Sequence, residues 1–348
     1  MSLPPSEIPL GAMRFNSDSN KLEYWNGTAW FQIKTFSPNL GDTQSTAGAR
    51  GLFTGGSTPT KVNTIDYVTI SSGGDAQDFG DLATTTRAHG AAASRIRGLN
   101  GGGNPASGGA INTIEFVTIS STGNSQDFGD LTISRNYLAA VNNATRGLFC
   151  GAWGPSRQSR IDHVLFATTG NAADFGDLTE AQQTDGSFSS PTRGFLVGGA
   201  AGSGPDYQAS TTGTQIECVT TTTLGNAFDF GDLLNGTYGK VGASNSIRGI
   251  AAGGYGSPAN ILAIEFIQMA TLGNATNFGD IVGNGYGFYY GAGTSDTTRA
   301  LFAGGSPSNV TDIEYVNIST EGNSVVFGDL TQARATLKGI SNANGGLG

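Results

Sequence analysis

The feature that most constrains this chain is an internal repeat of three short markers, which recur six times in the same order. An arginine before a small residue comes first, an isoleucine before an acid comes second, and the triplet Phe-Gly-Asp comes third. Successive arginines lie 47, 49, 47, 55 and 51 residues apart. The arginines are Arg50, Arg97, Arg146, Arg193, Arg248 and Arg299; the acids are Asp66, Glu115, Asp162, Glu217, Glu265 and Glu314; the triplets begin at Phe79, Phe128, Phe175, Phe230, Phe278 and Phe327. The chain is therefore built from six similar units.

Each unit is predicted to contain four strands separated by glycine turns. Residues 51–54 form a short apolar run that two glycines stop, and residues 64–70 are rich in β-branched and aromatic side chains. Residues 76–82 carry the Phe-Gly-Asp triplet, and residues 86–94 form a small, polar strand that begins the next unit. Periods of roughly 40 to 50 residues with four strands each are typical of β-propellers. The sequence thus predicts an all-β fold, a six-bladed β-propeller with four strands per blade.

The order of arginine, small strand, apolar strand ending in Gly-Gly, and Ile-acid-aromatic resembles the kelch repeat over residues 49–342. Kelch repeats usually carry a tryptophan in the fourth strand, where this chain has Phe-Gly-Asp, and an aromatic ring still fills the space between blades. Residues 331–342 match the small first strand, whereas residues 41–49 match it poorly. We therefore expect the C-terminal strand to complete the first blade and close the ring, which removes an exposed edge.

The repeated polar residues are predicted to be structural. Six copies on separate blades do not converge on one site, so we expect the acids to accept hydrogen bonds from turn amides and to pair with the arginines. The paired glycines are expected to serve tight turns with positive φ. Gly101–Gly103 is not a nucleotide-binding loop, because no helix follows it.

The inventory of reactive side chains argues against catalysis. His163 occupies a position that is aromatic in other units, His89 is a lone polar residue in a first strand, and Cys150 and Cys218 are expected to be buried thiols. We assign no catalytic residue, no cofactor and no metal site. A carbohydrate-active enzyme that uses two carboxylates stays open as an alternative, because such acids need only be close in space.

Residues 1–40 are predicted to be a separate segment, and residues 41–348 to be the propeller. The segment contains a hairpin signal around Asn26-Gly27, and residues 11–16 supply a third strand. So small a piece needs a packing partner. Its aromatic residues either pack on the propeller or form an attachment interface; they are Phe15, Tyr24, Trp25, Trp30 and Phe31.

The run GAMRFN followed by LEYWNGTAW, about 20 residues in all, is similar to a short module of bacteriophage tail-fibre and related virion proteins. The resemblance implies an attachment or trimerisation element that precedes a distal binding head. It implies a virion protein made in the host cytoplasm, whose partners are tail or baseplate proteins, further copies of itself, or a host-surface glycan. The beginning of the chain lacks a signal-peptide pattern, which agrees with this expectation.

A ligand-binding face is predicted where the second-to-third and fourth-to-first connections emerge together. Aromatic rings there suit sugar rings, and the alternative is that they anchor their own loops. The candidate residues are Trp153, Tyr207, Tyr238, Tyr255, Tyr286, Tyr289 and Tyr290.

Charge and hydropathy narrow the remaining function classes. The net charge of −9 argues against a nucleic-acid ligand, and no apolar run is long enough to span a membrane as a helix. The leading hypothesis is a non-enzymatic structural protein of a tailed-phage virion, a tail fibre or peripheral adhesion component. A cellular protein-interaction kelch propeller is the main alternative.

Overall fold

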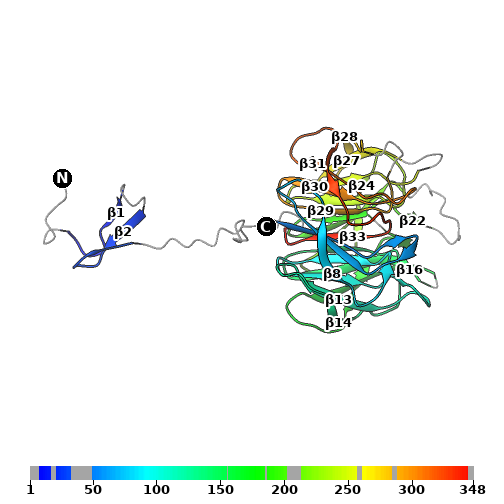
Figure 1. Ribbon diagram of the computed structural model, residues 1–348, viewed down its shortest axis with the longest axis horizontal. Helices are drawn as coiled ribbons and strands as arrows, with labels where there is room; N and C mark the ends of the chain where they lie inside the picture. The colour runs from blue at the N-terminus through cyan, green and yellow to red at the C-terminus, as the bar shows by residue number, and fades with distance from the viewer. Residues whose placement is uncertain are drawn as a thin grey trace. The chain divides into compact units, whose positions relative to one another are not determined.

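The computed structural model describes residues 8–16, 21–32, 49–154, 156–184, 186–201, 213–256, 261–283 and 288–343. The chain divides into two compact units, Met1–Thr43 and Gln44–Gly348. The described residues contain strands and no helix, so none of their segments is a helix that could cross a membrane. The prediction of an all-β chain is confirmed (Figure 1).

The first unit holds a three-stranded antiparallel sheet in the order β1-β2-β3. Its strands are β1 (Met13–Asn16), β2 (Lys21–Trp25) and β3 (Trp30–Gln32). The turn between β2 and β3 is held by Asn26, whose side-chain oxygen accepts hydrogen bonds from the amides of Thr28 and Ala29 at 2.9 and 2.8 Å. Gly27 supplies a φ of +97°, which suits a glycine. The predicted hairpin and its third strand are therefore present.

The described part of the second unit contains six four-stranded antiparallel sheets, which gives a propeller-like fold. We number these sheets 1 to 6 along the chain. Sheet 1 is β33 (Lys338–Ser341), β4 (Arg50–Thr54), β7 (Thr64–Thr69) and β8 (Gln77–Asp81); sheet 2 is β10 (Gly90–Ala93), β11 (Arg97–Gly101), β13 (Thr113–Thr118) and β14 (Gln126–Asp130); sheet 3 is β15 (Ala139–Asn142), β16 (Arg146–Trp153), β17 (Arg157–Leu165) and β18 (Ala173–Asp177).

Sheets 4 to 6 repeat the same order of strands. Sheet 4 is β20 (Gly186–Ser189), β21 (Arg193–Val197), β23 (Gln215–Thr220) and β24 (Phe228–Asp232); sheet 5 is β25 (Val241–Ser244), β26 (Arg248–Ala252), β27 (Ala263–Gln268) and β28 (Thr276–Asp280); sheet 6 is β29 (Ala292–Ser295), β30 (Arg299–Ala303), β31 (Asp312–Asn317) and β32 (Val325–Asp329). Short two-stranded sheets lie in the connections: β5 (Ser57–Thr58) with β6 (Thr60–Lys61), β9 (Thr86–Arg87) with β12 (Asn104–Pro105), and β19 (Gln182–Gln183) with β22 (Ala200–Ala201).

Sheet 1 combines the two ends of the second unit. The C-terminal β33, red in Figure 1, pairs antiparallel with β4, so that Ile340 lies opposite Leu52. The side chains of Ile340 and Leu52 are both buried in one apolar cluster with Ile65 and Phe79. Sheet 1 therefore cannot form until residues almost 300 positions apart have met.

The Phe-Gly-Asp triplets join each sheet to the next one. The glycine amide in the β-turn before each fourth strand donates to the carbonyl of the preceding sheet's triplet phenylalanine, at 2.7–3.2 Å. These pairs are Gly123–Phe79, Gly170–Phe128, Gly225–Phe175, Gly273–Phe230, Gly322–Phe278 and Gly74–Phe327. A Cβ on Gly80 would lie 2.6 Å from the carbonyl carbon of Gly123. The triplet therefore needs glycine because the next sheet lies directly against its backbone.

The repeated arginines also join neighbouring sheets, and here the sequence prediction is wrong. Each arginine donates from one terminal nitrogen to a main-chain carbonyl of the next sheet at 2.7–3.2 Å, and not to a carboxylate. In sheet 1, for example, Arg50 reaches the carbonyl of Ile119 and stands over the ring of Tyr67. In sheet 1 the acid Asp66 lies opposite Phe53, three positions along the strand from Arg50, and binds the turn amide of Thr331 instead. In chain order the acceptors are Ile119, Phe166, Thr221, Met269, Ile318 and Ile70.

A third series of hydrogen bonds joins the last residue of one first strand to the corresponding residue of the next sheet. The amides of Asn142, Ser189 and Ser244 donate to the side-chain oxygen of the corresponding residue in the next sheet, at 2.9–3.3 Å. The hydroxyls of Ser244, Ser295 and Ser341 donate back to the preceding carbonyl at 2.6–2.7 Å. At the equivalent position, sheet 2 has Ala93, which has no side-chain oxygen.

We predict that Ala93→Ser supplies this missing hydroxyl, which would donate to the carbonyl of Ser341. The free energy of unfolding should rise by about 1 kcal/mol, the net value of one intramolecular hydrogen bond. Chemical denaturation of the two proteins measures the difference.

Ala92→Ser is the matched control, because Ala92 packs in an apolar cluster with Leu99, Phe149 and Phe166. That hydroxyl would have no partner, and it should lower the stability by about 1–3 kcal/mol. Equal effects of the two serines would contradict the proposed role of the hydroxyl series.

Candidate functional site

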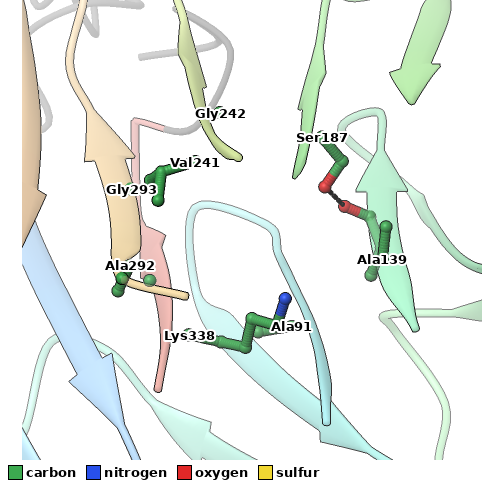
Figure 2. A pocket seen from close by; sticks show the side chains of 11 residues that line it. Ala91, Ala139, Ser187, Val241, Gly242, Ala292, Gly293 and Lys338 are labelled. Atoms are coloured by element: carbon green, nitrogen blue, oxygen red, sulfur yellow. Dashed lines mark hydrogen bonds between the residues drawn. The ribbon is translucent and has the colours of Figure 1, made fainter. Parts of the chain in front are cut away.

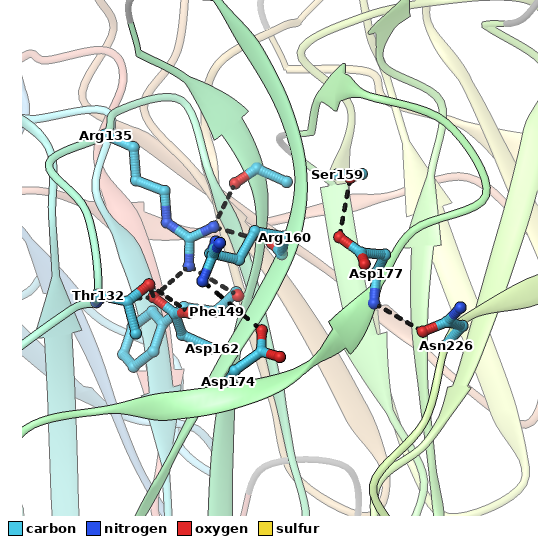
Figure 3. A network of polar contacts seen from close by, with 10 residues as sticks. Thr132, Arg135, Phe149, Ser159, Arg160, Asp162, Asp174, Asp177 and Asn226 are labelled. Carbon is cyan, nitrogen blue, oxygen red and sulfur yellow. Dashed lines mark hydrogen bonds and ion pairs between the residues drawn. The ribbon is translucent and has the colours of Figure 1, made fainter.

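Each of the six repeated acids accepts a hydrogen bond from the turn that leads into the first strand of its own sheet, as the sequence predicted. Each accepts the amide of the second residue after a Phe-Gly-Asp triplet at 2.8–3.2 Å. The donors are Ala83, Thr132, Thr179, Leu234, Val282 and Thr331. All six acids also accept a hydrogen bond from a side-chain hydroxyl or amide; for example, the Thr132 hydroxyl donates to Asp162 at 2.8 Å (Figure 3). These carboxylates therefore fix the backbone of the turns that precede the first strands.

Three of the acids also form ion pairs whose side chains have no exposed surface. The pairs are Arg334–Asp66 at 2.7 Å, Arg135–Asp162 at 3.0 Å and Lys240–Glu265 at 3.3 Å. Burial lowers the pKa of each cation, and the adjacent carboxylate opposes that shift. Arg135 also donates to the carbonyls of Phe149, Gly151 and Arg160, so its charge is held by four acceptors (Figure 3). A substrate does not reach these pairs.

The histidines and cysteines have structural environments. The ring of His163 packs edge-on against Phe175 with centroids 5.5 Å apart, as its aromatic position predicted. His89 is fully buried, and its Nε2 lies 2.9 Å from the Thr54 hydroxyl. Both cysteines are free and buried, as predicted, and burial raises the pKa of the Cys218 thiol to about 12. In the described ranges, no group of three or more histidine, cysteine, aspartate or glutamate side chains is arranged so that it could hold a metal ion.

A narrow cavity lies where the first strands of the six sheets approach one another. Its lining is mostly small residues, including Ala91, Ala139, Ser187 and Gly293, together with the longer side chain of Lys338 (Figure 2). Its volume is about 40 Å³. On this measure one water needs about 10–15 Å³, so the cavity has room for a few waters or a small ion and not for a sugar ring. A larger ligand must bind outside it.

Five tyrosines gather at one end of the second unit, and we call them the tyrosine cluster. Neighbouring ring centroids lie 5.2–5.8 Å apart, a spacing typical of packed aromatic pairs. Tyr238 is buried, whereas the other four side chains are partly exposed. The cluster is Tyr137, Tyr238, Tyr255, Tyr289 and Tyr290. It therefore presents an aromatic surface that is already packed in place.

Four of the cluster's tyrosines belong to the segments that lead into the first strands, which we call entry segments, and Tyr255 belongs to a second-to-third connection. Within its own sheet, Tyr238 pairs with Tyr255 of the second-to-third connection, and Tyr289 pairs likewise with Ser306. The same pairing joins Asn136 to Trp153, and Arg87 to Asn104. The two kinds of connection thus meet at one end of each sheet, as the sequence predicted.

A chain of backbone hydrogen bonds joins these entry segments across the sheets. The amide of Tyr137 donates to Ala88, that of Ala88 to Thr336, and that of Thr336 to Tyr290, at 2.6–3.0 Å. Tyr137 and Tyr290 have φ values of +50° and +56°, an uncommon conformation for a large residue. Both residues lie two positions before a first strand, in sheets 3 and 6, and their rings are in contact. We call this chain of hydrogen bonds the backbone belt, and it fixes the positions of the two tyrosine rings.

The structure brings together four of the predicted ligand-face residues. Tyr238, Tyr255, Tyr289 and Tyr290 belong to the tyrosine cluster. Trp153 lies at the same end of sheet 3, where Arg157 stands 5.6 Å from its ring. Tyr207 and Tyr286 lie outside the described residues. The sequence reasoning missed Tyr137, although aligning the repeats on their first strands places it in the same column as Tyr290.

The N-terminal sheet has one apolar face that differs from the predicted interface. Met13, Phe15, Leu22, Tyr24 and Phe31 share this face by register, and we call them the apolar face. Phe15 is 63% exposed and Phe31 is 49% exposed. These side chains agree with an attachment surface.

Trp25 and Trp30 lie on the opposite face of the sheet, so they do not join Phe15 as the sequence suggested. Trp25 is buried, and Arg14 stands 4.3 Å over the ring of Trp30. Arg14 also pairs with Glu23 at 2.9 Å. The two tryptophans thus form the small sheet's own core, because side chains alternate between faces along a strand.

Comparison with known proteins supports the fold and no more. No protein-family model matches the chain, and no curated protein matches it. A solved structure, that of YjhT, is similar over 74% of this chain and 89% of that one, with a TM-score of 0.60 and 12% sequence identity. At this identity the likeness concerns the overall fold alone.

The buried His89 predicts a specific acid sensitivity. Burial, with Lys338 nearby, lowers the pKa of folded His89 to about 3, whereas an unfolded histidine titrates near its usual 6.5. Below pH 6.5 the unfolded chain binds a proton that the folded protein refuses, so stability falls as the pH drops from 6.5 toward 3. His89→Gln should remove this loss, about 1.4 kcal/mol per pH unit.

Denaturant unfolding at pH 7.5 and pH 4.5 tests the prediction. The wild type should lose about 2–3 kcal/mol more than the variant over this interval. The same acid loss in both proteins would show that His89 does not titrate as a buried neutral group.

Proposed function

We propose that the six sheets are the blades of a closed, kelch-like propeller that acts as a binding head and not as an enzyme. The pairing of β33 with β4 supports closure, as do the bonds from Arg299 to Ile70 and from Gly74 to Phe327 between sheets 6 and 1. The repeated carboxylates are engaged in backbone bonds and buried ion pairs, which supports a binding role.

The head is proposed to bind a host-surface glycan at the tyrosine cluster. The observation that carries this proposal is a group of partly exposed aromatic rings at the end where the connections meet. Aromatic faces suit the apolar faces of pyranose rings, and the hydroxyls of tyrosine suit their polar edges. Gln183 extends the polar part, because its amide lies 3.4 Å from the hydroxyl of Tyr290.

The N-terminal sheet is proposed to attach the head to the particle. Its apolar face is too exposed to be a core, and such faces commonly bind other proteins. Together with the resemblance of residues 10–33 to tail-fibre modules, this favours a tail fibre or peripheral adhesion component of a tailed-phage virion. Its partners are then tail or baseplate proteins, or further copies of the chain.

Glycan-array binding tests the head. Tyr255→Ala and Tyr289→Ala should each weaken binding about tenfold, as expected for the loss of one stacking contact. Tyr289→Phe keeps the ring and should retain most of the affinity. Tyr315→Ala is the matched control, because Tyr315 packs against Phe327 away from the cluster. Glycan binding that survives both cluster variants would place the site elsewhere.

Sedimentation of the full-length chain tests the attachment surface. Phe15→Ser combined with Phe31→Ser should abolish assembly into oligomers or binding to isolated virions, because both changes lie on the apolar face. Glu23→Gln on the opposite face should not. A wild-type chain that stays monomeric and does not bind virions would contradict an attachment role.

A further inference from the structure

We infer that the glycan bound by the head carries an anionic substituent, and that Lys61 and Arg87 receive this group. The inference rests on the proposed glycan binding and names its chemical class. It starts from two cations that lie close together at the same end of the second unit as the tyrosine cluster. Arg87 belongs to an entry segment, and Lys61 to the short strand β6 of the neighbouring sheet.

Lys61 is held in place by the segment that pairs with Arg87. Its ammonium group donates to the side-chain oxygen of Asn104 at 2.7 Å and to the carbonyl of Pro105 at 2.5 Å. Asn104 is the strand partner of Arg87. The two cations thus converge from two sheets on one small segment, and burial together with Arg87 lowers the pKa of Lys61. Placing them together costs free energy unless an anion is present.

No carboxylate compensates these charges in the described part of the chain. The ion pairs found there use Arg14, Arg135, Arg160, Lys240 and Arg334, and include neither Lys61 nor Arg87. The Nε of Arg87 is buried without a hydrogen-bond partner. Other cations of the entry segments form an ion pair with a buried acid, as Arg334 does with Asp66. Arg87 is therefore a cation whose counterion is to be supplied from outside.

The backbone belt joins the segment that holds Arg87 to the segments that hold two of the aromatic rings. Arg87 precedes Ala88, whose carbonyl accepts the amide of Tyr137 at 2.7 Å and whose amide donates to Thr336 at 3.0 Å. Thr336 in turn donates to Tyr290. Position 87 is thus flanked by entry segments that lead to Tyr137 on one side and Tyr290 on the other. A glycan that extends from these tyrosines across the belt would meet the segment that holds Arg87.

This juxtaposition favours an acidic glycan over a neutral one. A guanidinium forms bidentate bonds with carboxylate or phosphate, and a lysine adds a point charge. The overall charge of −9 does not oppose this, because six of the acids are the repeat carboxylates, which are all buried. Both carboxylated and phosphorylated sugars carry the required chemistry, and the experiment separates them.

The test is a glycan array that contains neutral, carboxylated and phosphorylated members, probed with the full-length chain. We expect the acidic members to dominate the bound set, and either carboxylated or phosphorylated glycans to be preferred. Arg87→Gln and Lys61→Gln should each weaken that binding about tenfold or more, and 0.5 M NaCl should weaken it in the wild type. Arg95→Gln is the matched control, since it removes the same charge from the β10–β11 turn.

The outcomes separate this inference from the proposed function. Neutral glycans that bind through Tyr289 and are unaffected by Arg87→Gln would overturn the acidic preference and leave the binding head intact. No binding to any member would overturn both. Acidic binding that Arg95→Gln weakens as much as Arg87→Gln would reduce the effect to net charge and would also overturn the assigned site.

Discussion

The structure depends on hydrogen bonds that run from the backbone of one sheet to that of the next. A four-stranded sheet of this size has two edges, and unpaired edges are costly or prone to aggregation. Here the fourth strand is covered by the next sheet's glycine turn, as Gly123 covers Phe79. The first strand is covered by serine and asparagine side chains such as Ser244. The repeated residues therefore cover the edge strands of each sheet as well as forming its strands.

This constraint explains which residues recur. The triplet glycine recurs because the neighbouring backbone leaves no room for a Cβ, and the arginine recurs because it reaches a carbonyl one sheet away. The acid recurs because it anchors the turn that enters each first strand. Variation is then confined to the entry segments and the second-to-third connections. The tyrosine cluster and the Lys61–Arg87 pair both lie there, so the residues of the proposed binding site can change without altering the contacts between sheets.

The sequence predicted the strands well, because their signals are local. Residues 64–70 were expected as a strand and β7 spans Thr64–Thr69, while residues 331–342 were expected to contain the last strand and β33 spans Lys338–Ser341. Partners between sheets were harder to predict. The bond from Arg50 to the carbonyl of Ile119 and the contact between Tyr137 and Tyr290 both depend on geometry between distant segments. No local pattern encodes such distances.

In the proposed closed ring the pairing of β33 with β4 joins the two ends of the second unit, and amide hydrogen exchange of the intact protein tests this pairing most directly. Strand residues 338–341 should be protected as strongly as the first strands of sheets 2 to 6, and should open together with β4. Free exchange of Ile340 and Ser341, while the other first strands stay protected, would contradict the claim.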